Sequence, residues 1–369
     1  MFVGTKVMAL ALLIYWFALI LAGIATIPDQ LGLAEAAFYN LGVIYGLSGT
    51  NIPDPYSTID LCENIGIRKI RLLEHNDYVM LALNNTGHFE VSIGVRNDEL
   101  PEVASSVQAA ESWYELRVKP YHHGVIFDYI VVGNDAIPGP YSAYLAPALE
   151  NMMEAISVWE AGTSTKVTTV VSDSVLNPRF PPSVAAFKPE IKLYMEKVLK
   201  AIRKSRPVQS RLMVNVFPYY DYAAGIIPKD FAVFGRDKPY FWDSNLGYWN
   251  MFDALVDAFY WAISGVGVDG VFVEVAATGW PSAGNDKFTT SAIAAEYNQN
   301  LMEHIVNGNG TPYAPWFIEG FLYSLYNEDK KPVGPAQHFG LFNPDQTPAY
   351  PFSVPRDPPT PEAERVIKG

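Results

Sequence analysis

The chain has 369 residues, of which 49% are hydrophobic and 14% aromatic, and its 39 acidic and 26 basic side chains give a formal charge of −13. The apolar content excludes a disordered protein, and the excess of acids excludes a nucleic-acid binder, because such a protein needs clustered Lys and Arg to neutralise phosphates. One cysteine and six histidines exclude an internal disulfide framework and a thiolate-rich metal site, so we expect no metal and no cofactor.

The first predicted element is an apolar segment, residues 7–26, that directly follows Lys6. Its length of roughly twenty residues fits a cleaved signal peptide or an uncleaved signal anchor, and we favour the signal peptide. We therefore assign residues 1–37 to a leader and expect a secreted, extracellular protein that touches a membrane only if the leader stays attached. The tripeptides that begin at Asn84 and Asn309 match the N-glycosylation sequon, which agrees with secretion but also recurs by chance.

From residue 40 to residue 350, short β-branched runs alternate with segments that carry apolar residues at spacings of three and four. This alternation is typical of repeated βα units rather than of an antiparallel sandwich. The runs predict strands at residues 41–45, 69–72, 89–95, 126–132, 166–171, 212–216, 270–275 and 316–323. The segments between them predict helices at residues 57–65, 100–111, 145–160, 189–204, 251–263 and 289–306.

Eight strands with helical crossovers over about 310 residues predict an α/β fold, a (β/α)8 TIM barrel, which we place at residues 38–352. The alternative is a doubly wound open sheet, but no Gly-rich phosphate turn follows the first strand. No linker of low complexity divides this region, so the aromatic-rich residues 219–222 and 240–249 are predicted to be loops of a single domain. Residues 353–369 are rich in proline and predict a flexible tail.

Two predicted strand ends carry polar or aromatic groups where a parallel barrel places its working residues. Asn134 and Asp135 follow the fourth predicted strand, and Trp280 follows the seventh within the segment GWPS at 279–282. An acid beside an amide is either a general acid with an orienting neighbour or an Asx turn that starts the next helix. The Trp280 segment is either a platform for stacking a sugar ring or a rigid loop around a buried ring.

Ordered motifs along residues 40–350 carry a specific resemblance. They include LGVIYG at 41–46, GVRN at 94–97, VGN at 132–134, FPPS at 180–183, NVFPY at 215–219, FDA at 252–254, GWPS at 279–282 and HFGLF at 338–342. With these motifs the chain resembles plant glucan endo-1,3-β-glucosidases of glycoside hydrolase family seventeen. The resemblance implies a barrel whose open cleft binds β-1,3-glucan, in the cell wall or outside the cell. It also implies a retaining mechanism with two glutamates at the ends of strands four and seven.

The chain departs from that family at both catalytic positions. The acid/base glutamate implied by the resemblance corresponds to Asp135, and the implied nucleophile corresponds to Ala277. Retaining hydrolysis needs a second carboxylate about 5 to 5.5 Å from the acid, and a methyl group can neither attack the sugar nor stabilise the cationic transition state. An aspartate also retracts the proton donor by one methylene, roughly 1.5 Å. We therefore expect hydrolysis to be lost or strongly weakened.

Glu274 is the only carboxylate in the seventh predicted strand, and it lies three residues before Ala277. Three residues span about 10 Å along a strand, and a period of two places Glu274 and Ala277 on opposite faces. We predict that Glu274 faces the helix layer beside a basic or hydroxyl partner, although a bulge would change this parity.

Sugar binding depends on aromatic faces and hydrogen-bonding groups rather than on the catalytic pair. The candidates for stacking at strand ends are Tyr45, Tyr219, Tyr220 and Trp280, with Phe321 or Tyr323 in addition. Asn134 and Asn215 are candidates for hydrogen bonds to sugar hydroxyls. Trp242 and Trp249 are weaker candidates, because aromatic residues next to residues 251–263 more often pack within helices and loops.

Glu328 and Lys331 match, by the resemblance, an acid and a lysine that line the family's cleft after strand eight, although a surface charge run has the same pattern. Three functions stay open. The chain is a glucan-binding family member with impaired hydrolysis, an active endo-1,3-β-glucanase with an unforeseen carboxylate, or a structural barrel that no longer binds sugar. We favour the first, acting as a monomer on a β-1,3-glucan polysaccharide or oligosaccharide.

Overall fold

The computed structural model describes residues 40–159, 165–205, 210–316 and 318–355. Every described residue belongs to one compact unit, Phe38–Gly369. The predicted leader at residues 1–37 therefore lies outside the described residues, as do residues 356–369 of the predicted tail. None of the helices in the described ranges combines the length and the apolar character that a membrane crossing requires.

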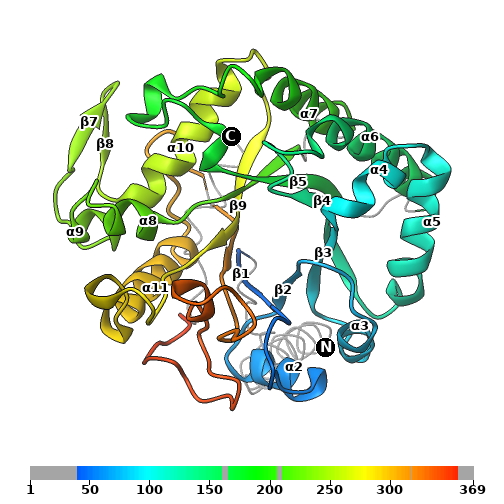
Figure 1. Ribbon diagram of the computed structural model, residues 1–369, viewed down its shortest axis with the longest axis horizontal. Coiled ribbons are helices and arrows are strands. Elements are labelled where there is room, and N and C mark those ends of the chain that lie inside the picture. Colours follow the sequence, from blue (N-terminus) through cyan, green and yellow to red (C-terminus); the bar gives the residue numbers. More distant parts are fainter. Residues whose placement is uncertain (1–39, 160–164, 206–209, 317, 356–369) are drawn as a thin grey trace, which may run out of the picture. The chain divides into compact units, whose positions relative to one another are not determined.

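Eight parallel strands close into a barrel in the order β1-β10-β9-β6-β5-β4-β3-β2, which confirms the predicted TIM barrel and excludes an open sheet (Figure 1). Each strand begins within four residues of its predicted start, because β-branched runs mark the buried strands. The strands are β1 (Leu41–Ile44), β2 (Lys69–Leu72), β3 (Glu90–Val95), β4 (Ile126–Asn134), β5 (Lys166–Ser172), β6 (Arg211–Asn215), β9 (Phe272–Thr278) and β10 (Gly320–Leu322).

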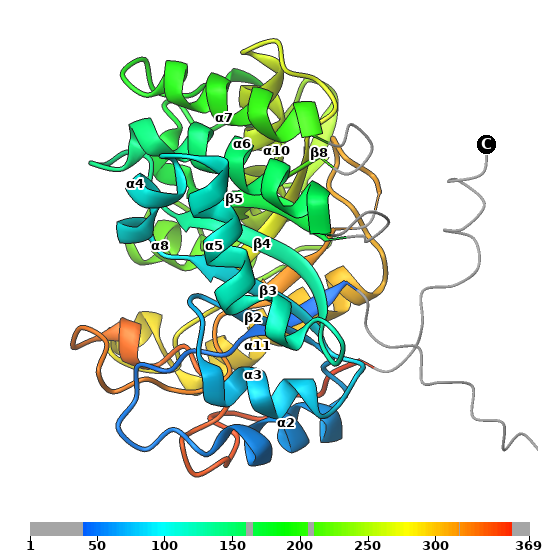
Figure 2. The ribbon, with the colours of Figure 1, turned by 90° about the vertical axis from the view of Figure 1, so that its right-hand side faces the viewer.

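The longer helices lie around the outside of the strands (Figures 1 and 2). Five of the six predicted helices are confirmed, and the one predicted at residues 100–111 is split into two at residues 104–106. The split occurs because Ser106 caps a new helix by accepting a hydrogen bond from the Ala109 N–H. The predicted helices appear as α2 (Pro55–Asn64), α4 (Leu100–Val103), α5 (Val107–Arg117), α6 (Ser142–Trp159), α7 (Lys192–Ser205), α10 (Met251–Ser264) and α11 (Ser291–Val306).

Short elements in the connections were missed or wrongly predicted to be loops. They are α3 (Asp77–Asn84), α8 (Pro218–Ala223), α9 (Lys229–Ala232) and the antiparallel hairpin of β7 (Phe241–Asp243) and β8 (Leu246–Tyr248). The hairpin turns at Ser244 and Asn245, which have φ angles of 48° and 69°. Two successive left-handed residues match the twist of a tight hairpin, but Ser-Asn is a weaker signal for such a turn than Asn-Gly.

Apolar side chains from six strands meet in one buried cluster. Because these strands together form most of the wall of the closed barrel, the cluster lies inside it. Its members are Ile44, Tyr129, Val131, Val170, Met213, Ala276, Ala277 and Phe321. At one edge of this cluster the Tyr129 hydroxyl donates a hydrogen bond to Glu319 at 2.6 Å. That bond connects the apolar layer to a polar one.

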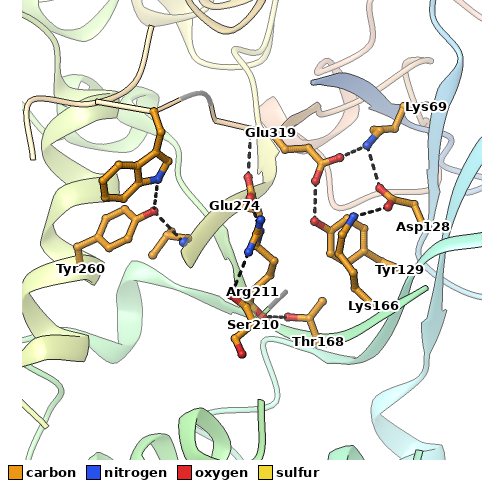
Figure 3. A network of polar contacts seen from close by, with 12 residues as sticks. Lys69, Asp128, Tyr129, Lys166, Thr168, Ser210, Arg211, Tyr260, Glu274 and Glu319 are labelled. Carbon is orange, nitrogen blue, oxygen red and sulfur yellow. Dashed lines mark hydrogen bonds and ion pairs between the residues drawn. The ribbon is translucent and has the colours of Figure 1, made fainter. Parts of the chain in front are cut away.

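The polar layer fills the end of the barrel where the strands begin (Figure 3). Lys69, the first residue of β2, points its ammonium at Asp128 (2.8 Å), Glu90 (3.0 Å) and Glu319. These three carboxylates lie close enough together to hold a cation, and Lys69 supplies that positive charge. Lys166 adds a second contact to Asp128. Lys69, Asp128 and Glu319 are almost fully withdrawn from water, whereas Glu90 and Lys166 are partly exposed. The pairing of the buried charges with one another offsets the cost of burying them.

We predict that Lys69→Met destabilises the fold by about 3–5 kcal/mol, because removing one partner leaves buried carboxylates unpaired. Urea unfolding followed by circular dichroism measures this change. As a matched control, Lys200→Met removes an exposed ammonium paired with Glu196 and is expected to change stability by less than about 0.5 kcal/mol. Equal, small effects of both substitutions would contradict the role given to Lys69.

Candidate active site

An open hollow of about 550 Å³ lies where β4, β5 and β6 end. It occupies the end of the barrel opposite to the Lys69 network, which is where parallel barrels bind substrates. Its lining is mostly polar or charged and consists of Asp135, Ser172, Asp173, Ser174, Leu176, Arg179, Lys188, Asn215, Phe217, Tyr220 and Asp221. The predicted acid and one predicted sugar-binding amide, Asp135 and Asn215, thus share one site.

Asp135 follows β4 in an uncommon backbone conformation. Gly133 and Asp135 have φ angles of 74° and 51°, and aspartate tolerates this left-handed region better than most residues. The Asp135 N–H donates to the Val170 carbonyl at 2.9 Å, which holds the turn against β5. The exposed carboxylate accepts a hydrogen bond from Asn215 Nδ2 at 2.8 Å. Asp135 is therefore oriented by the end of β6 rather than capping a following helix.

The environment of Asp135 shifts its proton affinity. The Asp135 side chain reaches solvent at the hollow, but the protein packed around it removes part of its hydration and so raises its pKa above the ordinary value. Hydrogen bonds from Asn215 and Ser172 and the charge of Arg71 lower the pKa, but they do not overcome this loss of water. A raised pKa is the direction that a general acid requires.

The side chain of Asn134 is hydrogen-bonded to another residue of the protein. Its Oδ1 atom accepts from Arg71 Nη2 at 2.9 Å, while Arg71 Nη1 donates to the Ala276 carbonyl at 2.9 Å. Burial lowers the pKa of Arg71 to about 10, and the guanidinium forms no ion pair with any residue of the described ranges. Arg71 therefore places a positive charge beside the ends of β4 and β9, and the nearby charge of Asp135 partly offsets the effect of its burial.

Ala277 lies at the end of β9, in register with Asn215 on β6. Only 5% of its surface is exposed, and its methyl group belongs to the apolar cluster inside the barrel. Since Asn215 also binds Asp135, one asparagine connects the two positions where the resemblance places the catalytic pair. The structure brings these positions to one end of the barrel, but only one of them carries a carboxylate.

The prediction that a sugar ring stacks on the exposed face of an aromatic residue is wrong for three of the candidates. Tyr45, Tyr219 and Trp280 are buried, so their faces are unavailable to a sugar. Trp280 Nε1 donates to the Phe288 carbonyl at 3.0 Å, as expected for a rigid loop around a buried ring. Their positions after strands did not reveal that loops fold over these rings. Tyr220, in contrast, is 59% exposed and lines the hollow.

Glu328 and Lys331 lie in the loop after β10. The Glu328 carboxylate is buried and accepts from the Ser48 N–H at 2.7 Å, so it holds the loop that follows β1 and is no part of a surface charge run. Lys331 is half-buried, and its N–H donates to the Glu328 carbonyl at 3.1 Å. A role of either residue in binding glucan stays a prediction.

An ion cluster in the hollow was missed. Arg179 bridges Asp173 and Asp221, with an Nη1 distance of 2.9 Å to each carboxylate. Burial raises the pKa of Asp173, Arg179 lowers it, and the charges of Asp221 and Asp135 raise it further. Asp173 directly follows β5, as Asp135 directly follows β4. The position of Asp173 shortly after a predicted strand was the signal in the sequence that could have revealed this ion cluster.

The prediction that Glu274 faces the helix layer is wrong, although its predicted basic partner is present. Glu274 pairs in register with Met213, whose side chain lies inside the barrel. Arg211 Nε binds Glu274 at 2.8 Å, and burial raises the pKa of Glu274 to about 7. The register shifts after Val275, so a bulge turns both Ala276 and Ala277 inward. Glu274 itself belongs to the polar layer shown in Figure 3, at the other end of the barrel.

The profile of glycosyl hydrolases family 17 matches residues 41–354. The chain belongs to this family. Its membership confirms the resemblance drawn from the ordered motifs, and the closed barrel agrees with it. The catalytic roles assigned to the positions of Asp135 and Ala277 stay predictions.

Several plant proteins are similar to this family 17 chain. "Probable glucan endo-1,3-beta-glucosidase BG4" of Arabidopsis thaliana is 38% identical over 315 residues, covering 84% of this chain and 90% of the relative. Lichenase-2 of Hordeum vulgare is 34% identical over 316 residues, covering 85% and 98%. The solved structure of CJP38, a beta-1,3-glucanase and pollen allergen of Cryptomeria japonica, has a TM-score of 0.81 at 34% identity and covers 86% of this chain and 100% of that one.

We predict that Asn215→Ala raises the pKa of Asp135 further, because the ionised carboxylate loses a hydrogen bond that stabilises it. Titration of the side-chain carboxyl carbons by ¹³C NMR measures the shift. The exposed Asp345 carboxyl, whose pKa is lowered by hydrogen bonds within its own turn, serves as an internal control and is expected to titrate unchanged. An unchanged or lower pKa of Asp135 would show that Asn215 does not stabilise its charge.

Proposed function

We propose that this family 17 chain is a secreted, monomeric protein of β-1,3-glucan metabolism that binds glucan at the hollow and has lost most or all hydrolytic activity. The observation that carries the proposal is the methyl group of Ala277 at the end of β9. The resemblance assigns the nucleophile to this position, and a methyl group provides no electron pair for attack on a sugar carbon.

The geometry supports one of the two requirements of retaining hydrolysis, the protonation of the leaving oxygen. Asp135 has a raised pKa and an open path to solvent, so it can hold a proton for a leaving oxygen. A retaining hydrolase also needs a carboxylate about 5 to 5.5 Å away, across the scissile bond. Without it, protonation is not followed by attack, and a bound glucan is released unchanged.

Three other carboxylates were candidates for the missing one, and the contacts of each argue against that role. Glu274 is paired with Arg211 at the opposite end of the barrel, and Glu328 is buried against the Ser48 N–H. Asp173 lines the same hollow as Asp135, but it is paired with Arg179 and directly follows β5, the strand adjacent to β4. A group on the neighbouring strand approaches a sugar from the same wall as Asp135 rather than from across the bond.

Binding is supported by the composition of the hollow. Ser172 and Ser174 offer hydroxyl groups that can hydrogen-bond sugar hydroxyls, and Asn215 lines the same hollow. The exposed ring of Tyr220 is available for stacking. The names of the similar plant enzymes, which include beta-1,3-glucanase, favour β-1,3-glucan as the polymer.

One observation favours a second candidate, an active glucanase that uses Asp173. Asp173 lines the same hollow as Asp135, and the charge of Asp135 raises its pKa, so the two carboxyl groups interact. In that case Asp173→Asn would abolish hydrolysis that the unmodified chain performs. The first proposal expects no such hydrolysis to lose.

We predict that the unmodified chain releases reducing ends from soluble β-1,3-glucan on the order of 10³-fold or more slowly than an active family member, because loss of a catalytic nucleophile has effects of this size or larger. The double variant Ala277→Glu, Asp135→Glu is expected to hydrolyse faster than its parent. Hydrolysis by the unmodified chain at an ordinary enzymatic rate would contradict the loss of activity.

Binding is measured separately, by sedimentation with insoluble β-1,3-glucan. Tyr220→Ala is expected to weaken binding, whereas Trp316→Ala removes a comparably exposed ring before β10, at the other end of the barrel, and is expected to leave binding unchanged. A parent chain that binds no β-glucan would support the structural-barrel alternative. Sequencing of the N-terminus of protein recovered from the medium of a eukaryotic host tests secretion.

A further inference from the structure

A second hollow lies on the flank of the barrel and shares no lining residue with the first. It has a volume of about 530 Å³ and lies between the β7–β8 hairpin and the loop at residues 308–315. Figure 1 shows the hairpin outside the ring of barrel strands. The lining residues that matter here are Trp242, Trp249, Asn245, Asn309, Pro312 and Pro315. Nothing in the proposed glucan site uses them.

Two indole rings in this lining are open to water. Trp242 is 68% exposed and Trp249 is 41% exposed, so packing within loops and helices does not account for their rings. Large aromatic faces are usually buried because water solvates them poorly. Two of them around one hollow form a surface suited to the apolar face of a sugar ring.

The hairpin that carries Trp242 is anchored firmly. The rings of Phe241 and Tyr248 stack with centroids 4.9 Å apart, and Asp243 accepts hydrogen bonds from the Ser183 N–H and hydroxyl at 2.7 and 2.5 Å. Trp249 directly follows β8 and leads into the cap of α10 at Asn250. The segment that carries the two indoles is thus held in place while both side chains stay exposed.

The sequon that begins at Asn309 forms part of the same hollow. Asn309 is exposed, while Thr311 is buried and donates its hydroxyl to Asp257. The Tyr313 N–H donates to the same carboxylate at 2.9 Å. These bonds hold the loop to α10, so the Asn309 amide is held in the same hollow as the indoles while staying accessible.

The other sequon is placed differently. Asn84 is the last residue of α3 and is half-buried, with its Oδ1 atom buried and without a partner among the described residues. Gly124 packs directly against it, because a Cβ atom at position 124 would lie 2.6 Å from Asn84 Oδ1. The amide of Asn84 therefore has little space for an attached sugar in the folded protein.

We propose that Asn309, and not Asn84, carries an N-linked glycan whose first N-acetylglucosamine units cover Trp242 and Trp249. The inference rests on the secretion in the proposed function, because N-glycosylation takes place in the secretory pathway. The Asn309 side-chain nitrogen bonds to the anomeric carbon of a sugar supplied by a lipid-linked oligosaccharide diphosphate. The bond from that carbon to the diphosphate oxygen breaks, and the amide loses one proton.

The site is tested on the full chain recovered from a eukaryotic secretory host, by mass spectrometry of its peptides before and after treatment with an amidase that removes N-glycans. Asn309→Gln is expected to lose one glycan, whereas Asn84→Gln is expected to lose none. Thr311→Ser keeps both the sequon and a hydroxyl for Asp257, so it is the matched control that retains the glycan. A glycan at Asn84, or none at Asn309, overturns the proposal.

The platform is tested by a double-mutant cycle on melting temperature. Asn309→Gln is expected to lower the Tm of the glycosylated parent by about 2 °C, the shift that a modest stabilisation produces in a domain of this size. In a Trp242→Ala, Trp249→Ala background the same substitution is expected to have no effect. An equal shift in both backgrounds overturns the contact between glycan and indoles.

These outcomes are separate from those of the glucan experiments. Protein made in bacteria carries no N-glycan, and its binding to insoluble β-1,3-glucan reports on the first hollow alone. If that protein binds glucan and the Trp242→Ala, Trp249→Ala variant binds equally well, the flank hollow is not a glucan site, as proposed. If the double variant loses glucan binding, the flank hollow holds external polymer and the assignment to the chain's own glycan is overturned.

Discussion

The barrel depends on the compensation of charges at the end where its strands begin. Lys69 contacts carboxylates from β3, β4 and the segment before β10, so one ammonium connects parts of the chain separated by up to 250 residues. Arg211 and Glu274 pair beside this group. Buried charges are tolerated only when each has partners, and the network meets that condition for a set of side chains that could not be buried singly.

This arrangement separates the two ends of the barrel. The end with the network is closed by ion pairs, whereas the opposite end is open and formed by loops, as in other parallel barrels. Two backbone irregularities lie toward the open end, the left-handed Asp135 and the register shift in β9. Arg71 extends toward that end, where its guanidinium donates hydrogen bonds to Asn134 at the end of β4 and to the Ala276 carbonyl of β9.

The strands could be predicted because their apolar, β-branched runs reflect burial on both faces. Sequence alone was much weaker at deciding which way a side chain points. Tyr219 and Tyr220 are adjacent after β6, yet one is buried and the other is 59% exposed. Similarly, simple alternation assigned Glu274 to the wrong face. The orientation of such groups depends on loop packing and on partners distant in sequence, which local patterns do not encode.

The bulge in β9 has a consequence for redesign of the protein. In a regular strand only one of two neighbouring positions projects into the barrel, but here Ala276 and Ala277 both contact its interior cluster. An acidic side chain introduced at either position would therefore point into the interior of the barrel. The two side chains would start from different positions along the strand. A small library that varies these two positions together would sample two directions of approach to a substrate on one unchanged backbone.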